Sequence, residues 1–138
     1  MKQCEIAPPE QLLRGIAQFN RGDWFDCHET LEELWVGEKG ELRDFYQGML
    51  QLAVALHHWR NGNFKGALTL LKGGCELLGR VPALCQGVDA AGLRADAAKL
   101  LAMLGALGED RMAELAAPHI LRVRLVQAGS AGSQPGEP

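Results

Sequence analysis

The chain contains 138 residues, 47% of them hydrophobic and 22% charged, and its formal net charge at pH 7 is −3. This size and composition predict an ordinary globular protein built around one hydrophobic core. The 14 lysines and arginines are scattered along the chain, which excludes the concentrated basic surface of a nucleic-acid-binding protein.

Apolar residues recur at helical spacing through most of the chain, and Gly, Asn and Pro residues separate the periodic stretches. This pattern predicts an all-α fold, a bundle of about five helices built from antiparallel helical hairpins. Asp23 and Asn63 are predicted N-caps of the second and fourth helices. The five helices are expected at residues 10–20, 24–36, 41–60, 64–78 and 89–107.

The last part of the chain should be less regular. A short helical turn over residues 109–116 is expected to stop at Pro118. Residues 119–126 alternate apolar and basic side chains, so they should form a short extended C-terminal segment lying on the bundle. Residues 1–127 are expected to form a single helical domain, whereas residues 128–138 contain nothing to bury and are expected to be disordered.

The cysteines and the apolar runs bear on location. Cys4, Cys27, Cys75 and Cys85 show no CxxC spacing, and we expect reduced thiols in a cytoplasmic protein. The N-terminus lacks the apolar stretch of a signal peptide. The longest apolar run, over residues 49–56, is far shorter than a membrane span, so no membrane contact is expected.

The third predicted helix is apolar almost all the way round, which is typical of the buried centre of a bundle. Its polar residues Asp44, Gln47, Gln51 and His58 fall within about 60° of one another, and His57 points about 100° away. In the fourth helix, the adjacent Gly73 and Gly74 each weaken the helix by about 1 kcal/mol relative to Ala. We expect a neighbouring backbone to come close there.

His28 and Glu32 are the residues of the second helix that do not fit its amphipathic pattern. They are four residues apart and therefore lie one above the other, on the flank of the apolar stripe beside Trp24 and Trp35. A histidine and a carboxylate at the edge of a core are costly unless they are paired or coordinated. This pair is therefore the main candidate for chemistry.

The short loop between the second and third helices predicts that they pack antiparallel, with Glu32 level with Gln47 and His28 level with Gln51. The polar strip of the third helix would then face the polar pair of the second in one internal cluster. Trp24 and Trp35 would be its walls, and Asp44 or His58 would lie toward its ends. The candidate binding residues are Trp24, His28, Glu32, Trp35, Gln47, Gln51 and His58.

Three interpretations of this cluster compete. It is a satisfied hydrogen-bond network that fixes the helix register, a pocket for a small molecule or peptide, or a metal site with ligands His28, Glu32 and either His58 or His119. Glu32 stands where the zinc motif HExxH has its second histidine, and glutamines are poor zinc ligands, so neither a metal nor a cofactor is expected.

Two simpler interpretations remain beside these. The polar strip of the third helix is explained equally well as that helix's solvent side, unrelated to His28. Cys27 beside His28 suggests a Cys–His nucleophile, but adjacent residues on a helix point about 100° apart, which disfavours this pairing.

The segments Phe19-Asn-Arg-Gly-Asp-Trp-Phe-Asp-Cys-His-Glu-Thr-Leu-Glu-Glu-Leu-Trp and Phe45-Tyr-Gln-Gly-Met-Leu-Gln resemble a family of small prokaryotic proteins known as a domain of unknown function. An HExxExxW signature followed by a QGxxQ helix characterises that family. The resemblance covers about residues 10–80 and implies an all-helical bundle of hairpins in a soluble cytoplasmic protein, without any reaction. The motif positions here are His28, Glu29, Glu32, Trp35, Gln47, Gly48, Gln51, Asn63, Gly66 and Ala67.

One departure from the family is Cys27, which stands where a small residue such as alanine is expected. We interpret the chain as a non-enzymatic binding or scaffolding module with a buried polar cluster around His28 and Glu32. Its partner would be a small molecule or a protein, and self-association is left open. The alternative is a metal-dependent hydrolase that uses the HExxxE helix.

Overall fold

The computed structural model describes residues 3–126, and within them the all-α prediction is confirmed. The five expected helices are present within two residues of their predicted bounds. They are α1 (Glu10–Arg21), α2 (Trp24–Val36), α3 (Gly40–Arg60), α4 (Phe64–Leu78) and α5 (Ala90–Leu107). Short elements accompany them: η1 (Gln3–Glu5), β1 (Leu84–Cys85), β2 (Val88–Asp89), η2 (Glu109–Glu114) and α6 (Ala117–Ile120).

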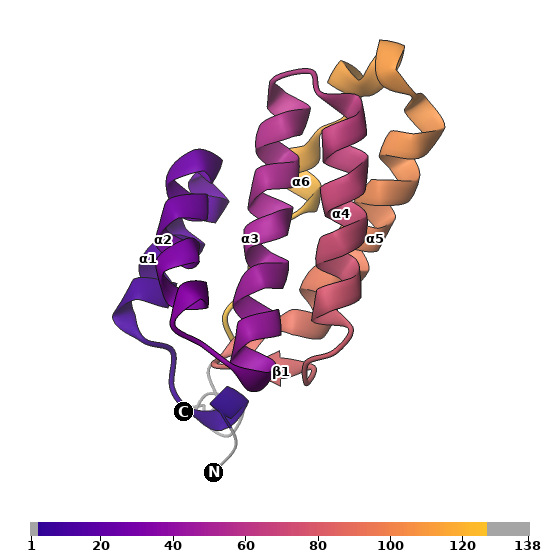
Figure 1. The fold of residues 1–138 in the computed structure, drawn as a ribbon. Coiled ribbons are helices and arrows are strands. Elements are labelled where there is room, and N and C mark those ends of the chain that lie inside the picture. The colour runs from indigo at the N-terminus through magenta and orange to yellow at the C-terminus, as the bar shows by residue number, and fades with distance from the viewer. Residues whose placement is uncertain (1–2, 127–138) are drawn as a thin grey trace, which may run out of the picture.

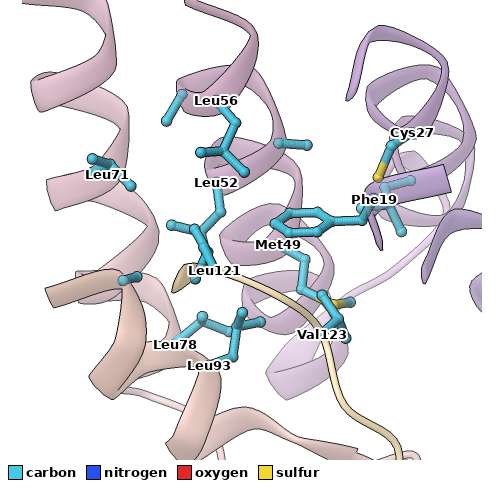
Figure 2. Close-up of a cluster of buried hydrophobic side chains, with 14 of the residues drawn as sticks. Phe19, Cys27, Met49, Leu52, Leu56, Leu71, Leu78, Leu93, Leu121 and Val123 are labelled. Atoms are coloured by element: carbon cyan, nitrogen blue, oxygen red, sulfur yellow. The ribbon is translucent and has the colours of Figure 1, made fainter. Parts of the chain in front are cut away.

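Consecutive helices pack against one another, so that α3 runs between the α1–α2 pair and α4, and α5 packs on the other side of α4 (Figure 1). The prediction that α3 is the buried centre is confirmed, because nine of its 21 residues are buried. Figure 2 shows Met49 and Leu52 of α3 among side chains of the flanking elements, including Phe19 and Leu71. No helix in the described part of the chain is long and apolar enough to cross a membrane.

The two predicted N-caps behave differently. The side chain of Asn63 accepts a hydrogen bond of 2.9 Å from the backbone N–H of Gly66, as expected. Asp23 precedes α2 but its side chain makes no capping hydrogen bond. Its carboxylate pairs instead with Arg21 at 3.0 Å, so Asp23 occupies the predicted N-cap position without the capping hydrogen bond expected of its side chain.

Helices α3 and α4 approach each other through glycines. A Cβ atom on Gly74 would lie 2.6 Å from Leu52 Cδ2 and 3.0 Å from the carbonyl oxygen of Gly48, and one on Gly48 would lie 2.9 Å from Leu78 Cγ. The expected close approach of a neighbouring backbone at Gly74 is therefore confirmed. Leucines of each helix fill the space that the facing glycine leaves, which fixes the rotation of α3 relative to α4.

The region after α5 departs from the prediction in two places. Pro118 does not stop a helix but lies in the first turn of α6, where proline is tolerated because the first N–H groups have no helical partner. The residues after Ile120 are extended as expected, and Leu125 forms a β-bridge with Val88 of β2. The expected disorder of residues 128–138 concerns positions outside the described residues.

The extended segment is held on the bundle by the side chain of Asn20. The Asn20 amide donates a hydrogen bond of 2.8 Å to the carbonyl of Val123 and accepts one of 2.9 Å from its N–H. Arg124 adds an ion pair of 3.1 Å with Asp96. The side chains of Leu121 and Val123 are buried, and Figure 2 shows them near Met49 and Leu93.

Cys4 and Cys85 form a disulfide across a sequence separation of 81 residues, so the expectation that all four thiols are reduced is wrong. The two residues meet because the N-terminal segment lies beside the β1–β2 hairpin, where Gln86 N–H donates a hydrogen bond of 2.7 Å to the carbonyl of Cys4. Disulfides are rare in cytoplasmic proteins. The cytoplasmic location is therefore no longer supported by the cysteines and stays a prediction.

The glycine contact between α3 and α4 gives the first prediction. Gly74→Ala should lower the free energy of unfolding by about 1–3 kcal/mol, because the added methyl group has no room beside Leu52. Gly105→Ala is the matched control, since Gly105 lies in α5 with no atom within 4 Å of an added Cβ. It should raise stability by up to about 1 kcal/mol through helix propensity.

Urea denaturation of both variants measures the difference. If Gly74→Ala is as stable as Gly105→Ala, the two helices do not approach as closely as the structure shows.

Candidate functional site

The internal polar cluster predicted between the second and third helices is absent. Glu32 is exposed and His28 is only half-buried. Gln47 and Gln51 are half-buried too, but the amide oxygen of Gln51 points at Gly73 of α4 rather than at α2. The predicted pairing of His28 and Glu32 with these glutamines is therefore wrong.

The polar strip of α3 follows the seam with α4. Asp44 lies 3.9 Å from Arg80, just beyond the end of α4, and His58 Nδ1 lies 3.2 Å from the side-chain nitrogen of Asn63, the cap of α4. By the helical period the strip lies beside Gly48, and His57 lies about 180° from that glycine. The side of α3 that faces α2 therefore carries His57 instead of Gln51.

The structure instead brings five side chains together at the N-terminal end of α2, and two of them, Trp24 and His28, were candidates from the sequence. Trp24, Phe25 and His28 of α2 and Val54 and His57 of α3 line a pocket of about 150 Å³. The Phe25 ring lies 6.2 Å from the His28 ring and 5.8 Å from the His57 ring between centroids. Phe25 is 55% exposed, so an aromatic face beside two imidazoles is open to solvent.

Trp24, a buried side chain of this pocket, is held by several contacts. Its Nε1–H donates a hydrogen bond of 3.0 Å to the carbonyl of Phe19, and its ring meets that of Trp59 edge-on at 6.3 Å. The Arg60 guanidinium lies 4.0 Å over the Trp24 ring and also donates a hydrogen bond of 2.7 Å to the carbonyl of Gly22. The pocket is therefore pre-formed on this side.

Trp35 does not share this pocket. It lies eleven residues after Trp24, or roughly 16 Å along the helix axis, and Arg43 stacks 4.8 Å over its ring. Its buried Nε1–H has no hydrogen-bond partner among residues 3–126. The prediction that Trp24 and Trp35 are two walls of one site is wrong.

The outer face of α2 is acidic. The helix contains no lysine or arginine, and none of its four carboxylates is in an ion pair within the described residues. Glu33 accepts a hydrogen bond of 2.8 Å from the Gln11 amide. The pocket thus lies at the end of a negatively charged surface formed by Asp26, Glu29, Glu32 and Glu33.

The described residues support neither a reactive Cys27 thiol nor a metal site at His28, the two chemical alternatives raised by the sequence. Burial raises the pKa of the Cys27 thiol to about 12, so the thiol stays protonated and is not an activated nucleophile. No three His, Cys, Asp or Glu side chains within residues 3–126 are grouped so that they could hold a metal ion. His28, Glu32 and His58 thus do not form a ligand set.

Sequence reasoning missed Phe25, Val54 and His57. The glycine pattern is the signal that could have placed His57 on the side of α3 that faces α2. If Gly48 marks the side of α3 that approaches Gly74, the neighbouring polar strip must face α4, and the opposite side, with His57, must face α2.

The segment that contains the pocket is similar to a known protein family. Residues 12–70 match the family described as a domain of unknown function, DUF309. This segment is a DUF309 domain. The resemblance inferred from the HExxExxW and QGxxQ motifs is therefore confirmed. All five residues that line the pocket lie within the DUF309 segment.

Two bacterial proteins are similar to this chain. The uncharacterized protein YpuF of Bacillus subtilis (strain 168) is 36% identical over 72 residues, which are 51% of this chain and 41% of YpuF. An uncharacterized protein of Aquifex aeolicus (strain VF5) is 29% identical over 87 residues, 62% of this chain and 26% of the relative. The chain thus spans less than half the length of either relative.

Buried acidic groups give a prediction for alkaline pH. Burial raises the pKa of Cys27 from 9.0 to about 12. Burial, and secondarily the charge of Glu38, raises the pKa of Tyr46 from 10.0 to about 12, and the protonated hydroxyl donates a hydrogen bond of 2.6 Å to the amide oxygen of Gln86. Between pH 9 and 12 the unfolded chain therefore loses these protons first. The free energy of unfolding receives the full contribution of these protonated groups below pH 9, and it should fall as the pH rises toward 12.

Urea denaturation between pH 8 and 11 tests this effect. Cys27→Ala should lose less stability than the wild type between pH 9 and 11, because one of the buried protonated groups is gone. Equal slopes in the two proteins would show that Cys27 is not protected from ionisation by the fold.

Proposed function

We propose that this DUF309 protein is a non-enzymatic binding module that docks a protein segment on α2. In this proposal an apolar side chain of the partner enters the pocket between α2 and α3, and basic residues beside it meet the acidic face of α2. The observation that carries the proposal is the exposed Phe25 ring beside His28 and His57, at the mouth of a pre-formed pocket.

The size of the pocket supports one side chain as the inserted group. A cavity of about 150 Å³ is large enough to hold benzene, and the pocket has about this volume. Trp24, Phe25 and Val54 supply apolar contact, and the imidazoles of His28 and His57 supply hydrogen-bonding groups beside it. A phenylalanine or leucine side chain of the partner fits this lining.

The charge of α2 supports basic flanking residues. Four carboxylates that have no cationic partner among residues 3–126 lie on the same helix as the pocket. Such a surface attracts a basic segment, raises its association rate and disfavours acidic competitors. The same field repels a nucleic-acid backbone, in line with the absence of a basic surface in the sequence.

Only some of the candidate residues from the sequence belong to the proposed docking surface. Trp24 and His28 line the pocket, and Glu32 is one of the carboxylates on the acidic face. Trp35 belongs to the other end of α2, and Gln47, Gln51 and His58 belong to the strip along α4. These four are therefore not part of the proposed docking surface.

A short peptide series tests the proposal. The probe is a synthetic pentapeptide with phenylalanine between two lysines, titrated to 5 mM into isotopically labelled protein and followed by NMR chemical shifts. It should shift the resonances of Phe25, His28, Val54 and His57. Replacing the phenylalanine by alanine, or both lysines by glutamate, should weaken binding about tenfold, which corresponds to about 1.4 kcal/mol.

Two protein variants complete the test. Phe25→Ala should weaken binding of the probe, whereas Val36→Ala should not, although Val36 is 67% exposed on the same helix. If the three peptides bind equally, if no shift occurs at 5 mM, or if the shifts fall on another surface, the proposal is wrong.

A further inference from the structure

A second hollow lies at the end of the molecule where the N-terminal segment, the β1–β2 hairpin and the last described residues meet. Its volume is about 710 Å³, within the range of small-molecule sites. Five of the eight large apolar side chains that are exposed in the described residues line this groove. These five are Ile6, Leu13, Leu84, Leu125 and Val126.

The groove is built from segments that are far apart in the sequence and are tied together. The Cys4–Cys85 disulfide joins the N-terminal wall to the hairpin, and Val126 N–H donates a hydrogen bond of 2.6 Å to the carbonyl of Gly87. Gly87, at φ +81°, leaves space between Pro8 and Leu125. These ties fix the positions of the groove walls relative to one another.

The charge of the lining decides which ligand fits. Among the ten lining residues, the one ionisable side chain is that of Glu5, since Cys4 is in the disulfide. Glu5 is exposed and is in no ion pair within residues 3–126. A ligand with an apolar body would cover the exposed leucine and isoleucine side chains of the groove. If one end of the ligand were cationic, that end would lie beside the Glu5 carboxylate.

We propose that this groove binds a small amphipathic molecule with an apolar body and a single cationic end. The site is separate from the proposed docking surface, because Leu13 is the one lining residue that lies inside the DUF309 segment.

Two eight-carbon amphiphiles of opposite charge test the proposal below their micelle-forming concentrations. Octyltrimethylammonium should bind to the protein several-fold more tightly than octyl sulfate in calorimetric titrations. Glu5→Gln should remove this preference while leaving the binding of the apolar chain. Leu84→Asp and Leu125→Asp should each abolish binding, whereas Val36→Asp, at an exposed apolar position elsewhere, should leave it unchanged.

The other outcomes overturn the proposal. Equal binding of the two amphiphiles contradicts the role of Glu5, and binding that survives Leu84→Asp and Leu125→Asp contradicts the site. A protein that binds neither probe but dimerises in sedimentation, with dimerisation lost in Leu125→Asp, would show that a second copy occupies the groove. Phe25→Ala should bind octyltrimethylammonium normally, so failure of the docking function and failure of this site are distinguishable.

Discussion

The close approach of α3 and α4 through Gly48 and Gly74 is the contact on which the rest of the arrangement depends. The central helix is apolar over most of its surface and must be buried on two opposite sides. Where Leu52 and Leu78 fill the spaces left by the facing glycines, the rotation of α3 about its axis is fixed. That rotation sends the polar strip with Gln51 to the α4 seam, and it turns Val54 and His57 toward α2.

The candidate site follows from this rotation. His28, which has no glutamine partner on α3, lies instead in a pocket with His57, Val54 and Phe25. Within residues 3–126 the buried side chains are mostly apolar, with Thr30 and Gln86 as buried polar residues, whereas the carboxylates of α2 lie on its outer face. Such a distribution suits a module that presents a surface to a partner. The groove with Glu5 lies at another end, formed largely by segments outside the DUF309 domain.

The five main helices were predictable from the sequence because apolar spacing and turn residues act locally, as at Asn63 and the Asn61-Gly62 turn. Features that depend on contacts between segments distant in the sequence could not be predicted from it. The two-residue strands β1 and β2 are too short to show a period, and Cys4 and Cys85 are 81 residues apart. The rotation of α3 could not be predicted from the sequence, because the effect of Gly48 and Gly74 depends on packing. His28 and Trp24 line a pocket with Val54 and His57 of α3, and the sequence did not indicate these two residues of α3 as their neighbours.

The rotation of α3 can be measured directly in solution by nuclear Overhauser effects between side chains. The account predicts cross-peaks between the ring protons of Phe25 and His57, whose centroids lie 5.8 Å apart. It also predicts cross-peaks from the Gln51 side-chain amide to the α-protons of Gly73, its neighbour on α4. Cross-peaks from the His28 ring to the Gln51 amide, with none between Phe25 and His57, would contradict it.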